Sequence, residues 1–145
     1  MTRINLIPVS ELTDQHLMAE YRELPMISSS LKRTLNSKAG WNISKVPDKY
    51  VLGTGHVLFF SNKRDFLVDR YFKLIEELRL REFNIDPNSR NIDWSIFDKV
   101  PQIEWNPTEE DILLNKARIE EKINLKPTWY KYYGQPLKFN IDSQS

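Results

Sequence analysis

The chain has 145 residues, of which 40% are hydrophobic and 28% are charged, a balance typical of a globular protein rather than a disordered one. It contains no cysteine, which excludes a disulfide framework, a cysteine nucleophile and thiolate metal sites. It begins without the long apolar run of a signal peptide and has no stretch of membrane-spanning length, so we expect a cytoplasmic protein with no membrane partner.

Charge is distributed unevenly along the chain. The formal net charge is only +1, which by itself argues weakly against a nucleic-acid partner. Residues 82–111 hold two basic and eight acidic residues, a net charge of −6, so the rest of the chain carries +7. Local potential guides association more than net charge does, and a basic body can present a phosphate-binding face. Charge alone nevertheless favours a mixed, solvated surface.

The first predicted helix opens near Ser10 or Thr13, both of which are good N-cap residues. Apolar residues then recur at helical spacing through residues 17–24. Pro25 lacks an amide donor and clashes with the preceding turn, so we expect it to kink or interrupt this helix. A continuation is expected to end near the polar stretch 36–40.

Two further helices are predicted in the second half of the chain. One runs from after Asn62 to about Arg81 along a broad apolar stripe. The other begins at Thr108, with Asp111 three residues on in a box-like capping arrangement, and stops at Pro127. The apolar residues expected to carry this last helix are Ile112, Leu113, Ala117, Ile119 and Ile123.

The connections 41–61 and 82–107 are long for a small domain and are expected to be functional or packed as irregular structure. The tail after about residue 134 is expected to fray. We therefore predict an all-α protein, with residues 1–145 forming a single compact domain of three main helices around one core.

Most local motifs indicate ordinary structure. Gly53-Thr54-Gly55 lacks the remaining residues of a dinucleotide or P-loop motif, so we interpret it as a turn. His16 and His56 are the only histidines, and we expect no metal cofactor. Arg118 and Lys122 lie four residues apart and so share one helix face, which alone indicates a solvated surface.

The run Trp129-Tyr130-Lys131-Tyr132-Tyr133 interleaves aromatic rings with a cation. Such rings stack on exposed bases while lysine meets phosphate. A terminal aromatic arm also packs readily into a groove between helices. We expect partial packing, with nucleic-acid contact by some rings left open.

Position 2 is threonine, a residue small enough that the initiator methionine is normally trimmed. The mature chain would then begin with the α-amine of Thr2, whose pKa of about 7.7 to 8.0 leaves a useful fraction nucleophilic at neutral pH. Many chains begin Met-Thr without catalysing a reaction, so this feature alone favours no enzyme.

Several segments nevertheless coincide with one known family. They are residues 1–6, 10–12, 14–25, 55–57, 59–60, 117–118, 121–123 and 126–134. Together they closely resemble the pyrimidine-dimer glycosylases, the family of phage endonuclease V. The similarity extends from residue 1 to about 134, in the same order and with near-identical spacing.

The resemblance implies a helical DNA-repair enzyme that recognises ultraviolet-induced cyclobutane pyrimidine dimers. It implies that the Thr2 amine attacks deoxyribose C1′ and displaces the damaged base, and that the resulting imine permits β-elimination and strand nicking at the abasic site. Glu23 stands at the position of a carboxylate essential for base removal, which also assists the lyase step. A carboxylate there stabilises the positive charge that develops on the sugar, and no cofactor is required.

The resemblance also implies a DNA-binding surface for double-stranded DNA that contains pyrimidine dimers or abasic sites. The protein is expected to act as a monomer. Such a protein would work in the cytoplasm, on the nucleoid or on viral DNA in the host cytoplasm. The implied DNA-binding residues are Arg3, Gln15, His16, Arg22, Arg118 and Lys122, and the aromatic run adds Trp129, Tyr130 and Lys131.

The chain departs from the family at Met26, where some members carry a third basic residue, and residues 28–50 and 82–107 match poorly. Two kinds of alternative stay open. An abasic-site lyase, or a glycosylase for oxidised or ring-opened purines, would share the amine but not the lesion. A non-catalytic module would bind distorted duplex, although the presence of Thr2 together with Glu23 argues against it.

Overall fold

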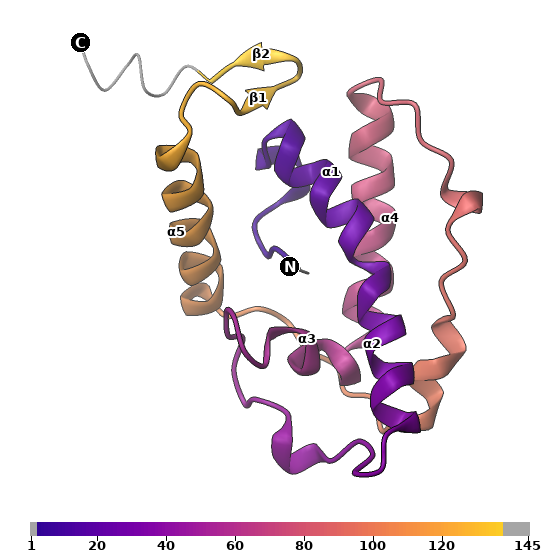
Figure 1. Ribbon diagram of the computed structural model, residues 1–145. Helices are drawn as coiled ribbons and strands as arrows, with labels where there is room; N and C mark the ends of the chain where they lie inside the picture. Colours follow the sequence, from indigo (N-terminus) through magenta and orange to yellow (C-terminus); the bar gives the residue numbers. More distant parts are fainter. Residues whose placement is uncertain (1–2, 138–145) are drawn as a thin grey trace.

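The computed structural model describes residues 3–137, and this part of the chain is built mainly from α-helices (Figure 1). The predicted all-α class is confirmed. The helices are α1 (Asp14–Glu23), α2 (Pro25–Asn36), α3 (His56–Phe59), α4 (Arg64–Leu80) and α5 (Glu109–Leu125). A short antiparallel hairpin, β1 (Lys131–Tyr132) and β2 (Gln135–Pro136), follows α5. Among residues 3–137, no helix combines the length and hydrophobicity needed to cross a membrane.

The predicted interruption at Pro25 is confirmed and separates α1 from α2. Thr13 is the N-cap of α1, and its Oγ1 accepts a hydrogen bond from the His16 amide at 3.1 Å. Leu24 still donates its amide to the Glu20 carbonyl at 2.8 Å. Pro25 has no amide to continue this ladder and instead occupies the first turn of α2, where its fixed φ is favourable.

The apolar stripe of α4 is buried as predicted. Leu67, Leu74 and Leu78 are completely buried and belong to the same core as Leu17 and Tyr21 of α1. Figure 1 shows α1 and α4 running side by side through the molecule. The N-terminal segment is hydrogen-bonded to both helices of this pair, and α5 is joined to that segment through Asn115.

The capping box at the start of α5 is confirmed: Thr108 and Asp111 exchange side-chain and backbone hydrogen bonds at 3.0 and 3.1 Å. Two of the apolar residues expected to carry α5 do not pack into the core. Leu113 is 56% exposed and Ala117 is also exposed, whereas Asn115 is completely buried. The buried face follows a four-residue spacing through Asp111, Asn115, Ile119 and Ile123.

The predicted turn at Gly53-Thr54-Gly55 is present. Gly53 and Gly55 have φ angles of +75° and +92°, which glycine adopts without steric cost. A Cβ on Gly55 would also come within 3.0 Å of the Pro47 side chain. The turn leads directly into α3, an element that the sequence analysis did not predict, and so brings His56 into the interior.

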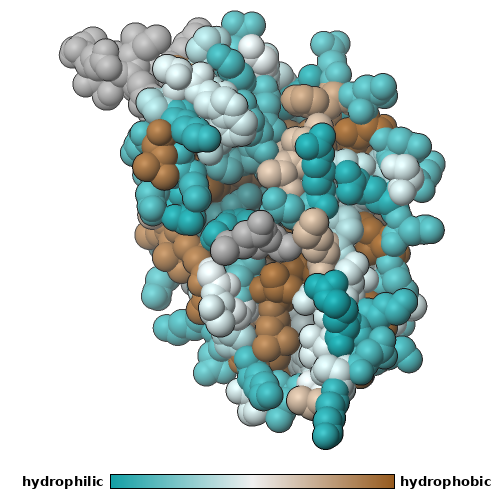
Figure 2. Space-filling model, in the orientation of Figure 1, coloured by the Kyte–Doolittle hydropathy of each residue, from teal (hydrophilic) through white to brown (hydrophobic). Residues whose placement is uncertain are grey.

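The remaining connections are packed as irregular structure with short helical turns. Trp94–Lys99 forms a 3-10 helix that buries Ile96 and Phe97 against the core. Residues 3–7 form an extended segment between α1 and α5 (Figure 1). The face in Figure 2 is mostly hydrophilic, and its hydrophobic residues form separate patches.

Candidate active site

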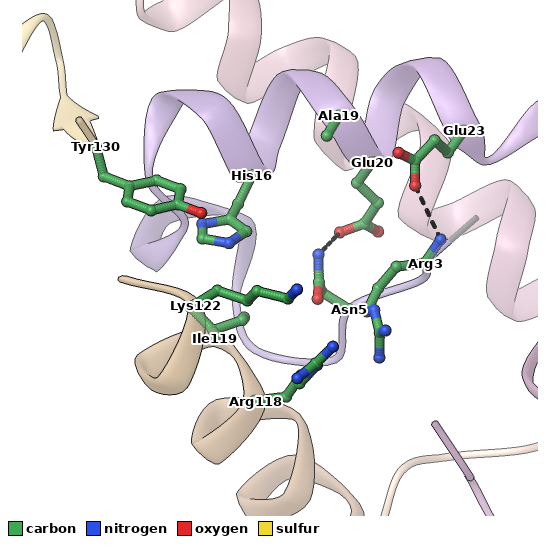
Figure 3. A pocket seen from close by; sticks show the side chains of 10 residues that line it. All are labelled: Arg3, Asn5, His16, Ala19, Glu20, Glu23, Arg118, Ile119, Lys122 and Tyr130. Atoms are coloured by element: carbon green, nitrogen blue, oxygen red, sulfur yellow. Dashed lines mark hydrogen bonds between the residues drawn. The ribbon is translucent and has the colours of Figure 1, made fainter. Parts of the chain in front are cut away.

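A cleft of about 280 Å³ lies between the N-terminal segment, α1, α5 and the residue before the hairpin (Figure 3). Its lining residues are Arg3, Asn5, His16, Ala19, Glu20, Glu23, Arg118, Ile119, Lys122 and Tyr130. The cleft thus unites side chains that are more than 100 positions apart in the sequence. Six of the residues predicted for the site, Arg3, His16, Glu23, Arg118, Lys122 and Tyr130, line it.

Glu23 lies at the end of the cleft nearest the N-terminus. Its Oε1 accepts a hydrogen bond from the backbone amide of Arg3 at 3.0 Å (Figure 3). Burial raises the pKa of Glu23, the Arg3 amide and charge oppose that change, and the neighbouring Glu20 adds to it. The carboxylate is therefore placed against the backbone next to residue 2. Thr2 itself lies outside the described residues.

Glu20 forms the floor of the cleft and is held in a buried polar cluster. Its carboxylate accepts two hydrogen bonds from Arg70 of α4, at 2.7 and 2.9 Å, and a third from the Asn5 side chain at 3.0 Å. The Glu20 side chain is completely buried, so this pairing neutralises a charge that would otherwise be very costly. Among residues 3–137, no arginine side chain pairs with Glu23 in this way, which distinguishes Glu23 from Glu20.

Three cationic side chains line the cleft, as Figure 3 shows: Arg3 from the N-terminal segment, and Arg118 and Lys122 from α5. Arg118 donates to Glu121 at 3.1 Å but keeps 28% of its side chain exposed. Since Arg70 already neutralises the charge of Glu20, the balance of charge in the cleft favours an anionic ligand. The helical spacing predicted a shared face for Arg118 and Lys122, and the structure turns that face toward the cleft.

His16 and Tyr130 form the far wall of the cleft. Their rings are parallel, with centroids 4.7 Å apart, and Thr13 Oγ1 lies 2.7 Å from His16 Nδ1. Desolvation, followed by the nearby charge of Lys122, lowers the pKa of His16 to about 4. His16 is therefore a neutral, stacked ring at physiological pH.

The other predicted DNA-binding residues lie outside the cleft. Gln15 donates to the Trp129 carbonyl and accepts from the Lys131 amide, so its side chain joins α1 to the aromatic run. Trp129 is 54% exposed, and partial packing of the run is confirmed by the burial of Tyr130. Arg22 is exposed and lines a separate depression beside Arg90.

Sequence reasoning did not identify the buried polar residues that support the cleft. They are Asn5, Glu20, Tyr50, His56, Arg70 and Asn115, of which Asn5, Glu20 and His56 were included only as parts of matching segments. The one usable signal was a polar residue that stands where the helical spacing of apolar residues calls for an apolar one, as Arg70 does on α4 and Asn115 on α5. In residues 3–137, no group of three or more histidine, aspartate or glutamate side chains converges as a metal site requires.

A family model confirms the resemblance drawn from the sequence. The model for pyrimidine dimer DNA glycosylases matches residues 1–91. This range contains the N-terminal segment, all of α1, α2, α3 and α4, and thus Arg3, Glu20 and Glu23. The structure adds α5 and Tyr130, which complete the cleft from beyond the matched range. The chain belongs to the pyrimidine dimer DNA glycosylase family.

Proposed function

We propose that this DNA-repair glycosylase is bifunctional, and that the N-terminal amine of Thr2 is its nucleophile. The enzyme would excise cyclobutane pyrimidine dimers and then nick the abasic strand. The observation that carries the proposal is the 3.0 Å hydrogen bond from the Arg3 amide to Glu23, because it holds a carboxylate beside the residue that follows Thr2.

The first step joins the Thr2 nitrogen to deoxyribose C1′ and breaks the bond between C1′ and the base nitrogen. The bonding electrons leave with the base, which takes up a proton. Positive charge develops on the sugar during this cleavage, and the partly buried Glu23 carboxylate is placed to stabilise it. The sugar ring then opens to give an iminium between the protein and C1′.

The second step uses this iminium as an electron sink. A proton leaves C2′, the bond from C3′ to its phosphate oxygen breaks, and the phosphate departs as the strand is nicked. Water hydrolyses the imine and regenerates the amine. Glu23, whose carboxylate accepts from the Arg3 amide, is our candidate for assisting the proton transfer.

DNA binding is assigned to the cations of the cleft and to the side chains around it. Arg3, Arg118 and Lys122 would contact phosphates near the lesion, with Arg22 on the neighbouring surface. His16 and Tyr130 would provide a stacked wall for an unstacked base. Gln15, Trp129 and Lys131 would form the rim. We propose that a monomer acts on cytoplasmic DNA.

Borohydride trapping tests the proposal. The protein, with Met1 removal verified by mass, is mixed with three duplexes that carry a cis-syn thymine dimer, an abasic site or no damage. We expect covalent adducts at Thr2 with the first two and none with the third. An adduct only with the abasic duplex would reduce the protein to a lyase or to a glycosylase for another base. Binding to the damaged duplexes without any adduct would indicate a non-catalytic module.

The variant Glu23→Gln tests the role of the carboxylate. We expect it to bind dimer DNA as the wild type does but to cleave the bond between C1′ and the base about 10²- to 10⁴-fold more slowly. Glu76→Gln, which neutralises an exposed carboxylate on α4, is the matched control and should keep the wild-type rate. Cleavage of this bond by Glu23→Gln at the wild-type rate would remove this residue from the mechanism.

A further inference from the structure

The extended segment 3–7 forms no sheet or helix, yet residues 4–7 are buried. Buried backbone amides and carbonyls need hydrogen-bond partners, and here side chains of the surrounding elements provide them. Glu23 accepts from Arg3, Asn115 accepts from Leu6 and Ile7 at 2.7 and 3.2 Å, and Arg70 donates to the Ile7 carbonyl at 2.7 Å. The position of this segment therefore depends on individual side chains.

The backbone amide and carbonyl of Ile4 are both hydrogen-bonded to side chains of the segment 50–56. The Ile4 amide donates to Nε2 of His56 at 2.8 Å, and Tyr50 donates its hydroxyl to the Ile4 carbonyl at 2.8 Å. His56 is 2% exposed, and its ring meets the Tyr50 ring edge-on at 5.4 Å. The positive φ at Gly55 directs the chain into α3, of which His56 is the first residue.

The partners of His56 define its tautomer. Its Nδ1 lies 2.8 Å from the Val51 carbonyl, which can only accept, so Nδ1 carries the proton. The lone pair of Nε2 is then directed at the Ile4 amide. Burial lowers the pKa of His56 and so keeps the ring in this neutral form, in which it can accept.

We propose that His56 is a positioning residue for the N-terminal amine, which it orients by accepting the hydrogen bond from Ile4. The inference rests on the proposed function, because the amine matters only if Thr2 is the nucleophile. Only Arg3 lies between Ile4 and Thr2, so two steps along the chain, which reach at most about 7 Å, join them. A shift of Ile4 is therefore carried to the amine, and a misplacement of about 1 Å at a reacting group can cost roughly 100-fold in rate.

The test compares His56→Gln with His56→Asn. Both variants place an amide in the same buried site, but the longer glutamine can set an oxygen where Nε2 lies, whereas asparagine reaches only as far as Nδ1. The readouts are the single-turnover rate of borohydride trapping on saturating abasic duplex, the Kd for a duplex with a non-cleavable abasic analogue, and hydrogen exchange at the Ile4 amide.

We expect His56→Asn to trap roughly 10- to 100-fold more slowly at an unchanged Kd, with faster exchange at Ile4, and His56→Gln to recover most of the rate. Phe97→Leu is the control for general destabilisation, because Phe97 is completely buried but takes no part in the hydrogen bonds described for residues 3–7. It should keep the wild-type trapping rate.

Failure of the positioning role and failure of the proposed function give different results. Equal trapping rates for His56→Asn, His56→Gln and wild type would overturn the positioning role and leave the proposed function intact. The absence of any adduct with the wild type would overturn the proposed function and, with it, this inference. A slow His56→Asn variant with equally weakened binding would also overturn the positioning role, because a general structural defect lowers both quantities.

Discussion

Two buried ion pairs join α1 to the α4 side of the molecule, one toward each end of α1. Arg70 pairs with Glu20 at 2.7 Å, and Arg81 pairs with Asp14 at 3.0 Å. Each pair also holds one end of the described chain. The first is bonded to Asn5 and to the Ile7 carbonyl, whereas the carboxylate of the second accepts from the amides of the turn at 133–134.

The two pairs differ in what lies beside them. Glu20 lines the cleft next to Glu23, but Asp14 and Arg81 do not line it. Arg81 instead lies under the rings of Tyr132 and Tyr133, each with its centroid 4.7 Å from the guanidinium carbon. The same kind of ion pair therefore supports the N-terminal segment in one place and the aromatic hairpin in the other. Stability and activity are separable by breaking one pair at a time.

The largest effect is expected from Arg70→Met. This change leaves the Glu20 carboxylate buried without its partner and should lower the free energy of unfolding by about 3–5 kcal/mol. It should also slow trapping by the folded fraction, since the Ile7 carbonyl loses its donor. Urea denaturation and single-turnover trapping measure the two effects. Arg79→Met, at an exposed position of α4, is the matched control, and an equally stable Arg70→Met would refute the prediction.

Arg81→Met breaks the other pair. The Arg81 side chain is completely buried between Asp14 and Glu77, so we expect a loss of about 3 kcal/mol in urea denaturation. Trapping by the folded protein should proceed at the wild-type rate, because Arg81 does not line the cleft. A trapping rate as low as that of Arg70→Met would show that the two ion pairs are not functionally distinct.

A smaller loss is expected from Asn115→Leu. Asn115 is completely buried, and its removal leaves the amides of Leu6 and Ile7 without an acceptor. We expect the free energy of unfolding to fall by about 2–3 kcal/mol. Asn124→Leu changes an exposed asparagine on the same helix and should stay within about 0.5 kcal/mol of wild type. Equal urea midpoints for both variants would contradict this expectation.

The cleft should also give stability a dependence on pH. The pKa of His16 is about 4 in the folded protein and has an ordinary value of 6.5. Between these values the unfolded chain binds a proton that the folded chain does not, so stability is full above pH 6.5 and is lost as the pH falls toward 4. Allowing for partial exposure of His16, the loss is about 1–2 kcal/mol.

Urea denaturation across this pH range measures the dependence on His16. His16→Phe is the reference, because it keeps a ring against Tyr130 but cannot titrate. The difference in stability between the two proteins should change by the stated amount from pH 7 to pH 4. Parallel pH curves for the two proteins would exclude His16 as the source.

The smallest effect is expected at the aromatic hairpin. Tyr133 donates its hydroxyl to Glu77 at 2.8 Å, so Tyr133→Phe should cost about 1 kcal/mol in urea denaturation. In the Arg81→Met background the cost should be different, because Arg81 and Tyr133 share Glu77. Strictly additive losses of stability in the double variant would show that Arg81 and Tyr133 are not energetically coupled.

Most predictions that depended on local periodicity and capping were accurate. Thr13 and Thr108 are the caps of α1 and α5, Pro25 separates two helices, and the apolar stripe of α4 is buried. The interactions behind these features lie within three or four residues of one another, so a short stretch of sequence contains all the information. The resemblance likewise depended on short segments whose order and spacing are given directly by the sequence.

The polar support of the cleft depended on contacts that no local pattern reveals. Ile4 meets His56 across 52 positions, and Leu6 meets Asn115 across 109. A polar residue on an amphipathic helix is ordinarily exposed, so the places of Asn115 and Arg70 in the apolar period were the only local sign that they lie inside, and Leu113, an apolar residue of α5, is exposed. Sequence alone determined the longer helices, the caps of α1 and α5, and the family. Only the folded chain decided which polar side chains are buried, because burial of a polar group requires partners that the tertiary structure brings together.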